Sequence, residues 1–224
     1  MRPIRIGLLV PHTDTTLEWD LQRRFGGRCS LHTERMFLAD VTVDAEIKMM
    51  EDEAPRAVGY LKAIKPDILV FGCTSAGALY GVDGERAFTA GLGQTLGCPA
   101  ISAFGSVMRH LSAIRAERIA LFTPYTAEVH EEVVSSVRES GVEVIWDDHL
   151  GLIEDSDIGN LDPSALHARL AGAPIDPTSC DTLFMSCTNL RADEIAGDLS
   201  VDLGVHVFGS NSAIIGSLNA LLRT

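Results

Sequence analysis

The sequence predicts an α/β protein built from two similar halves, each a parallel sheet flanked by helices. Short apolar runs alternate with segments of helical spacing along the whole chain. The run Ile68–Phe71 is apolar at every position, as is typical of a parallel strand that is covered on both faces. In addition, the two halves of the chain contain similar motifs in the same order.

Strands are expected at the short apolar runs that Gly, Pro or polar residues bound. These runs are Arg5–Val10, Ile68–Phe71, Pro99–Ile101, Arg118–Phe122, Glu143–Trp146, Thr182–Met185 and His206–Phe208. Helical spacing follows the first run, where Leu17, Leu21 and Phe25 share one face. It recurs over residues 44–64, although Pro55 must bend or restart that helix.

An internal repeat supports the division into halves, because three stretches of the first half recur in the second at offsets of 113, 114 and 107 residues. The pairs are residues 6–16 and 119–129, 67–74 and 181–188, and 97–107 and 204–214. The second pair makes Cys73 equivalent to Cys187. The repeat predicts a first half over residues 1–110 and a second over 111–210. A last helix over 211–224 is expected to pack back on the first half.

Composition restricts the classes of partner and the expected compartment. The 18 Lys and Arg and the 31 Asp and Glu give a formal net charge of −13, which disfavours binding to nucleic acid or to anionic membranes. No apolar run approaches the length of about 18 residues that a membrane span needs, and the first ten residues are too short and too charged for a signal peptide. A cytoplasmic enzyme is expected. The five cysteines lack CxxC pairs and predict reduced thiols without a metal site.

Cys73 and Cys187 are the strongest candidates for chemistry. Each follows an apolar strand and precedes two small hydrogen-bonding residues, which are Thr74 and Ser75 in the first half and Thr188 and Asn189 in the second. Because ligands bind at the carboxyl ends of parallel strands, both thiols are expected on opposite walls of one active-site cleft between the halves. A helix that begins there would favour the thiolate. The alternative is that these cysteines only fill buried space.

Four motifs together resemble a known family. They are P-x-x-x-T-T-x-E at Pro11–Glu18, C-T-S at Cys73–Ser75, T-P-Y at Thr123–Tyr125 and S-C-T-N-L-R at Ser186–Arg191. In these motifs the chain resembles maleate cis-trans isomerase, within the aspartate/glutamate racemase superfamily that also contains arylmalonate decarboxylase and hydantoin racemase. The resemblance spans nearly the whole chain. It implies two pseudo-symmetric flavodoxin-like halves and a cofactor-free reaction at a carbon next to a carboxylate of a small acid.

The resemblance also implies roles for individual residues. In an isomerase, Cys73 adds as a thiolate to the substrate double bond and Cys187 handles the proton, whereas in a racemase the two thiols are opposed acid and base. The residues implied to bind substrate are Asp14, Thr74, Ser75, Tyr125, Asp155, Thr188, Asn189 and Arg191. Neither a metal nor another cofactor is implied. The implied partner is a small carboxylate, and a homo-oligomer is left open.

Two positions depart from the family pattern. Asp14, and near the second position Asp155, stand where the family has asparagines, the first of which helps bind a substrate carboxylate. A carboxylate repels another carboxylate, so the substrate could carry an ammonium or amide at this point. Asp14 could equally cap the helix that begins near Thr15.

Two alternative functions stay open beside the isomerase or racemase. One is an arylmalonate-type decarboxylase, and the other is a carboxylate-binding protein without turnover. The decarboxylases of this superfamily lack the first cysteine. The presence of both Cys73 and Cys187 therefore favours the isomerase or racemase.

Overall fold

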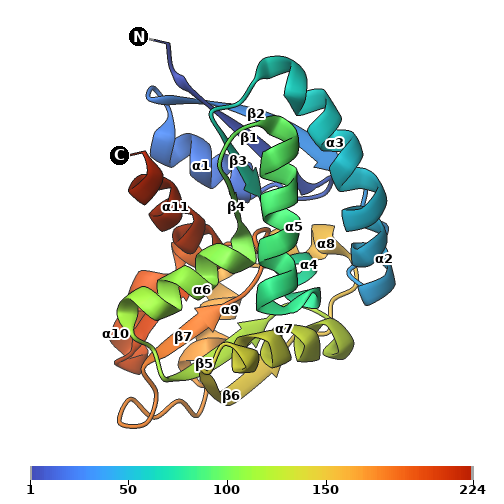
Figure 1. The fold of residues 1–224 in the computed structure, drawn as a ribbon. Helices are drawn as coiled ribbons and strands as arrows, with labels where there is room; N and C mark the ends of the chain where they lie inside the picture. Colours follow the sequence, from blue (N-terminus) through green and yellow to red (C-terminus); the bar gives the residue numbers. More distant parts are fainter. Residues whose placement is uncertain (1, 223–224) are drawn as a thin grey trace.

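The computed structural model describes residues 2–222 and contains two parallel four-stranded sheets (Figure 1). Their strand orders are β2-β1-β3-β4 and β6-β5-β7-β8. The strands are β1 (Ile4–Pro11), β2 (Cys29–Met36), β3 (Ile68–Phe71), β4 (Ala100–Ser102), β5 (Arg118–Thr123), β6 (Glu143–His149), β7 (Thr182–Met185) and β8 (His206–Gly209). Each strand of the first sheet thus has a counterpart at the same place in the second. The predicted fold class is confirmed.

Helices cover the sheets, and the connection after nearly every strand is helical, as parallel pairing requires (Figure 1). They are α1 (Leu17–Phe25), α2 (Val43–Lys48), α3 (Ala54–Leu61), α4 (Thr74–Leu79), α5 (Gly81–Leu96), α6 (Ala103–Ile114), α7 (Ala127–Glu139), α8 (Asp155–Gly159), α9 (Pro163–Ala171), α10 (Ala196–Leu203) and α11 (Ser210–Leu221). Shorter helical turns are η1 (Met49–Glu53), η2 (Lys62–Ile64) and η3 (Ala192–Glu194).

Alternation along β1 divides the core of the first half into two layers. Ile6 and Leu8 belong to a cluster with Leu21 of α1 and Leu218 of α11, whereas Leu9 belongs to a larger cluster that continues into the second half. Helix α11 also packs on α6. Helix α11 therefore packs back on the first half, and residues 223–224 of the helix expected over 211–224 lie outside the described residues. The expected boundary between the halves at residue 110 stays a prediction.

Two elements refine the expectations from the sequence. Strand β2 was not expected, because its polar residues occupy a half-buried position at the edge of the sheet and lack an apolar run. The helix expected over residues 44–64 divides into α2, the π-helical turn η1 and α3. The π-helical turn ends two residues before Pro55, which lacks a backbone N–H and cannot continue a regular hydrogen-bond ladder.

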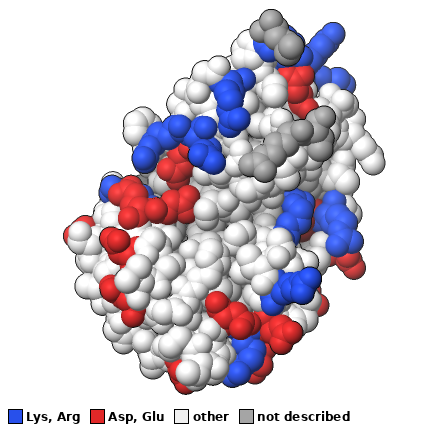
Figure 2. All heavy atoms as spheres, turned by 90° about the vertical axis from the view of Figure 1, so that its left-hand side faces the viewer, with Lys and Arg blue, Asp and Glu red and all other residues white. Residues whose placement is uncertain are grey.

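The surface carries both signs of charge. On the face in Figure 2, basic and acidic side chains lie beside one another and are separated by uncharged areas. Within residues 2–222, no helix is both long and apolar enough to span a membrane.

Candidate active site

A small cavity lies where the carboxyl ends of β1, β3, β5 and β7 meet, and both halves of the chain line it. Its walls are Pro11, Leu38, Val41, Glu46, Cys73, Thr74, Ser75, Tyr125, Asp155, Cys187 and Thr188. Its volume is about 10 Å³, close to the minimum that one water molecule needs. The structure thus brings both predicted thiols to one enclosed place, together with five more of the predicted site residues.

Cys73 lies between the end of β3 and the first residue of α4. The preceding Gly72 allows helix α1 to approach closely, because a Cβ there would lie 2.4 Å from Leu17 Cδ2. The Cys73 Sγ is 3.7 Å from the Oγ of Ser75, which in turn donates a 2.5 Å hydrogen bond to Oε1 of Glu46. The first thiol is therefore linked through a serine to a buried carboxyl group.

Burial and then the neighbouring Glu46 raise the pKa of the Cys73 thiol well above its ordinary value. The N–H of Ala76 at the start of α4 lowers this pKa, as expected, but the other effects are larger, so the expected net stabilisation of the thiolate is wrong for this closed cavity. Helix α4 has only six residues, and its partial positive charge is outweighed by loss of water and by a nearby acid.

Cys187 lies in a different backbone setting. Its φ of 125° is in the left-handed region, which costs a residue with a side chain about 1–3 kcal/mol and is found where the surroundings impose it. The expected helix after this cysteine is absent, since residues 188–191 form a loop that leads to η3. Burial, then Asp155 and Asp14, raise the pKa of the Cys187 thiol well above its ordinary value.

The start of α11 supplies two residues that hold the cysteine loops and that the sequence interpretation missed. The Ser210 Oγ accepts hydrogen bonds from the Cys187 N–H at 3.2 Å and from the Thr74 hydroxyl at 2.8 Å. Asn211 donates from Nδ2 to the carbonyl of Thr188 at 2.9 Å. Both residues follow β8, so applying the strand-end rule to the third repeat would have found them.

Tyr125 and Thr188 add hydroxyl groups to the cavity. The Tyr125 side chain is 2% exposed, and its hydroxyl lies 3.5 Å from the Oγ of Ser186. Burial and then the two thiols raise the pKa of Tyr125 well above its usual value, so it is a neutral donor. The Thr188 hydroxyl donates to the carbonyl of Gly72 at 3.2 Å and joins the two cysteine loops.

Asp155 lines the cavity, whereas Asn189 supports it from behind. The Asp155 Oδ2 accepts hydrogen bonds from the Thr13 hydroxyl at 2.6 Å and from the Asn189 amide at 3.1 Å. The other end of that amide, Oδ1, accepts from the N–H of Thr15 at 2.9 Å. Burial raises the pKa of Asp155, and these two side-chain donors oppose the change. Asn189 is thus occupied by protein groups, and its predicted contact with substrate gains no support from the geometry.

Asp14 and Arg191 also lie outside the cavity lining. The buried Asp14 accepts hydrogen bonds at Oδ1 from the N–H groups of Thr16, at 3.0 Å, and Leu17, at 2.9 Å, which is the capping geometry given above as an alternative. Burial raises the pKa of Asp14 to about 6. Arg191 forms an exposed ion pair with Glu194 at 2.7 Å, so a role in steadying substrate gains no support.

Glu46 is the main member of the cavity that the sequence interpretation missed. It lies on α2 and is fully buried, and its Oε2 has no hydrogen-bond partner. Burial raises its pKa to about 8, although the bond from Ser75 opposes the rise. A signal was present, because Glu46 is four residues before Met50 and so shares the buried face of that helical stripe.

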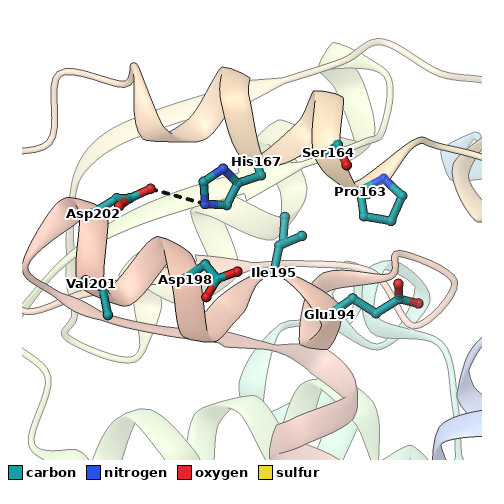
Figure 3. A pocket seen from close by; sticks show the side chains of 8 residues that line it. All are labelled: Pro163, Ser164, His167, Glu194, Ile195, Asp198, Val201 and Asp202. Atoms are coloured by element: carbon teal, nitrogen blue, oxygen red, sulfur yellow. Dashed lines mark ion pairs between the residues drawn. The ribbon is translucent and has the colours of Figure 1, made fainter.

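Three larger hollows among residues 2–222 have no cysteine in their linings. Figure 3 shows one between α9 and α10, of about 580 Å³, where His167 Nε2 lies 3.2 Å from Asp202 Oδ2. No thiol lines it, and it is open to solvent. Across residues 2–222, no three His, Cys, Asp or Glu side chains are arranged to hold a metal ion.

Comparison with known proteins gives the family. The model of the arylmalonate decarboxylase family matches residues 6–223. The chain belongs to this family. A maleate isomerase from Geobacillus stearothermophilus is 26% identical over an alignment of 233 residues. This alignment covers 96% of this chain and 92% of that protein. A maleate isomerase from Nocardia farcinica is 26% identical over 192 residues, which cover 82% and 75% of the two chains.

Solved structures show the same fold. A crystal structure of a variant of the Pseudomonas putida maleate isomerase with maleate has a TM-score of 0.92 at 21% identity, covering 99% of this chain and 93% of that one. The Nocardia farcinica maleate cis-trans isomerase, in a variant with a covalently bound succinylcysteine intermediate, has a TM-score of 0.90 at 21% identity, covering 99% and 94%. Arylmalonate decarboxylase itself has a TM-score of 0.75 at 21% identity, covering 93% and 88%. The expected family and the expected class of enzyme, an isomerase, are confirmed.

Proposed function

We propose that this protein is a cofactor-independent cis-trans isomerase of a small dicarboxylate, with maleate as the first substrate to test. The observation that carries the proposal is the pair of thiols, Cys73 and Cys187, which line one cavity from the ends of equivalent strands. Two thiols on one substrate can divide the reaction between covalent addition and proton transfer.

The reaction begins when the Cys73 thiol loses its proton to water and the resulting thiolate adds to one alkene carbon. A C–S bond forms as the π bond breaks, and the electron pair of the π bond moves through the other alkene carbon into the carboxylate attached to it, which becomes an enediolate. Cys187 gives its proton to the carbon next to that carboxylate, and the C–C single bond rotates. Cys187 then removes the proton and the C–S bond breaks, which releases the trans product and restores both sulfurs.

The cavity suits the charge that develops in this reaction. The neutral hydroxyl of Tyr125 can donate to an enediolate oxygen in a buried place, where such a bond is stronger than in solvent. A dicarboxylate is larger than the enclosed volume of about 10 Å³, so cavity-lining side chains must move aside for it to bind.

The alternatives predict different chemistry. An arylmalonate-type decarboxylase would need only Cys187 and would release carbon dioxide, and a racemase would exchange the α proton of an amino acid. A binding protein without turnover would do neither. Both cysteines line the cavity, which favours the two-thiol reaction over the decarboxylase.

The test is a proton NMR screen in deuterated water with maleate, aspartate, glutamate, a hydantoin and an arylmalonate. The proposal expects maleate to become fumarate without any added metal or cofactor. Decarboxylation of the arylmalonate, or α-proton exchange in an amino acid without isomerisation of maleate, would replace the proposal. Binding without any reaction would support the inactive carboxylate-binding protein.

A further inference from the structure

We propose that Glu46 binds the substrate, donating a hydrogen bond from Oε2, as a neutral acid, to one carboxylate of the dicarboxylate. The proposal rests on the function proposed above. It gives Glu46, which the sequence interpretation missed, a role in substrate specificity.

The two oxygens of Glu46 have different surroundings. Oε1 accepts the hydroxyl hydrogen of Ser75 at 2.5 Å, so the proton of a neutral Glu46 is left for Oε2. Oε2 is buried and has no protein partner, and the side chain that carries it lines the cavity. A buried polar atom without a partner is costly, which indicates that a ligand supplies the partner.

The cavity is short of other donors. None of the residues that line it is a Lys, Arg or His. The hydroxyl hydrogens of Thr74, Ser75 and Thr188 are already given to Ser210, Glu46 and the carbonyl of Gly72. Among the side chains of the cavity, that leaves the thiols, the hydroxyl of Tyr125 and the carboxyl groups of Glu46 and Asp155 to face a carboxylate. Oδ2 of Asp155 already accepts two hydrogen bonds, from Thr13 and Asn189, whereas Oε2 of Glu46 has no partner.

The titration of Glu46 supports this arrangement. Its pKa of about 8 makes it a neutral donor at pH 7, whereas the ionised form would repel a carboxylate. The titratable groups that face it are Cys73, Asp155 and Tyr125. On the adjacent η1, Glu51 and Asp52 are exposed, and Glu53 pairs with Arg56.

The test measures maleate binding by calorimetry in a Cys73→Ala background, which cannot form the covalent adduct and removes the titration of that thiol. Between pH 7 and 9.5 the dissociation constant is expected to rise about 30-fold, because affinity falls about tenfold per pH unit beyond the pKa of Glu46. Adding Glu46→Gln, which keeps both an acceptor and a donor, is expected to reduce this rise to about twofold or less. Adding Glu46→Leu removes the donor and should weaken binding about 10- to 100-fold at pH 7.

Glu85→Gln in the same background is the matched control. Glu85 is also buried and accepts a hydroxyl hydrogen, from Thr89 at 2.6 Å, but it does not line the cavity. Its replacement should leave the full pH dependence. The proposal is overturned if Glu46→Gln keeps the pH dependence, if Glu46→Leu binds normally while folded, if maleate binds more tightly as pH rises, or if no binding is measurable.

Turnover of maleate by the wild type separates the two proposals. An enzyme that isomerises maleate, but binds it without this pH dependence, retains the proposed function and loses the role of Glu46. A protein that does not isomerise maleate, but binds it with this pH dependence, retains the role of Glu46 in binding and loses the proposed function.

Discussion

The two halves place a thiol at the end of the equivalent strand, yet they hold it in different ways. Cys73 has an extended backbone with φ −143° and leads directly into helix α4. Cys187 has a φ of 125° and leads into a loop that residues at the start of α11 hold. The repeat therefore reproduced the strand and the cysteine without reproducing the local structure that follows.

The acids beside the two thiols differ as well. Glu46 approaches Cys73 through Ser75, whereas Asp155 and Asp14 lie on the side of Cys187. Each thiol is thus protonated at rest, and each can be tuned by a different carboxyl group. The difference teaches that one cavity can contain two thiols in chemically distinct surroundings, as a division of the proposed reaction between them would require.

The largest expected effect comes from removing either thiol. Cys73→Ser and Cys187→Ser should each lower turnover of maleate by about 10⁴-fold or more, because a hydroxyl cannot replace a thiolate here. The comparison is sharpened by mass spectrometry, since Cys187→Ser should accumulate substrate bound to Cys73 and Cys73→Ser should not. Cys180→Ser is the control, because that cysteine is equally buried but lies outside the cavity. If both cavity variants accumulated bound substrate, or neither did, the proposed division of roles between Cys73 and Cys187 would be wrong.

The next effect concerns stability and Glu46. Its pKa rises on folding from 4.5 to about 8, so the folded protein holds an extra proton between these values and loses stability as pH rises through them. Relative to Glu46→Gln, the free energy of unfolding of the wild type should fall by about 3 kcal/mol between pH 4.5 and 7, at 1.36 kcal/mol per pH unit. Urea denaturation at the two pH values measures this difference.

Glu85→Gln serves again as the control, because it also replaces a buried glutamate with a neutral amide but does so outside the cavity. The pKa of Glu46 would be ordinary if both glutamine variants behaved alike. In that case the acid next to Cys73 would be ionised at neutral pH, and the contrast between the two thiols would narrow.

A smaller effect tests the backbone difference directly. Glycine adopts a positive φ without strain, so Cys187→Gly should be more stable than Cys187→Ala by about 1 kcal/mol. At the extended position the order should reverse, with Cys73→Gly less stable than Cys73→Ala by about 0.5–1 kcal/mol. Denaturant midpoints of the four variants decide this. The same order at both positions would mean that Cys187 is not strained.

Patterns that depend on burial were predictable from the sequence, and those that depend on contacts between distant residues were not. Ile68–Phe71 and Thr182–Met185 were bounded correctly, because an apolar run at every position has few other interpretations. Strand β2 escaped notice because it is polar, although its counterpart β6 was expected and the repeat could have supplied it.

The site followed the same rule. Cys73 and Cys187 were placed correctly at one cavity by the strand ends alone. The pKa directions of their thiols were wrong, because they depend on closure of the cavity and on acids far away in the sequence. Glu46 lies on a helix that the pattern had assigned only to packing, so nothing local indicated that its carboxyl group would face a thiol.

The smallest expected effect concerns Asp14, one of the two positions where the family pattern described above predicts an asparagine. Asp14→Asn keeps the Oδ1 acceptor for the N–H groups of Thr16 and Leu17 and removes a charge that raises the pKa of Cys187. Because burial and Asp155 contribute more to that pKa, alkylation of Cys187 by iodoacetamide, in a Cys73→Ala background at pH 8, should quicken by only about threefold.

Asp162→Asn is the matched control for this prediction, since Asp162 also caps a helix, with Oδ1 accepting from the Ser164 N–H at 3.0 Å, but is exposed. It should leave the alkylation rate of Cys187 unchanged. The KM for maleate of Asp14→Asn should differ from that of the wild type by no more than about threefold, because Asp14 does not line the cavity. A large gain in maleate turnover would instead place Asp14 against the substrate. Asp14 would then help to determine which substrate binds. Its contact with the substrate would matter more than its effect on the pKa of Cys187.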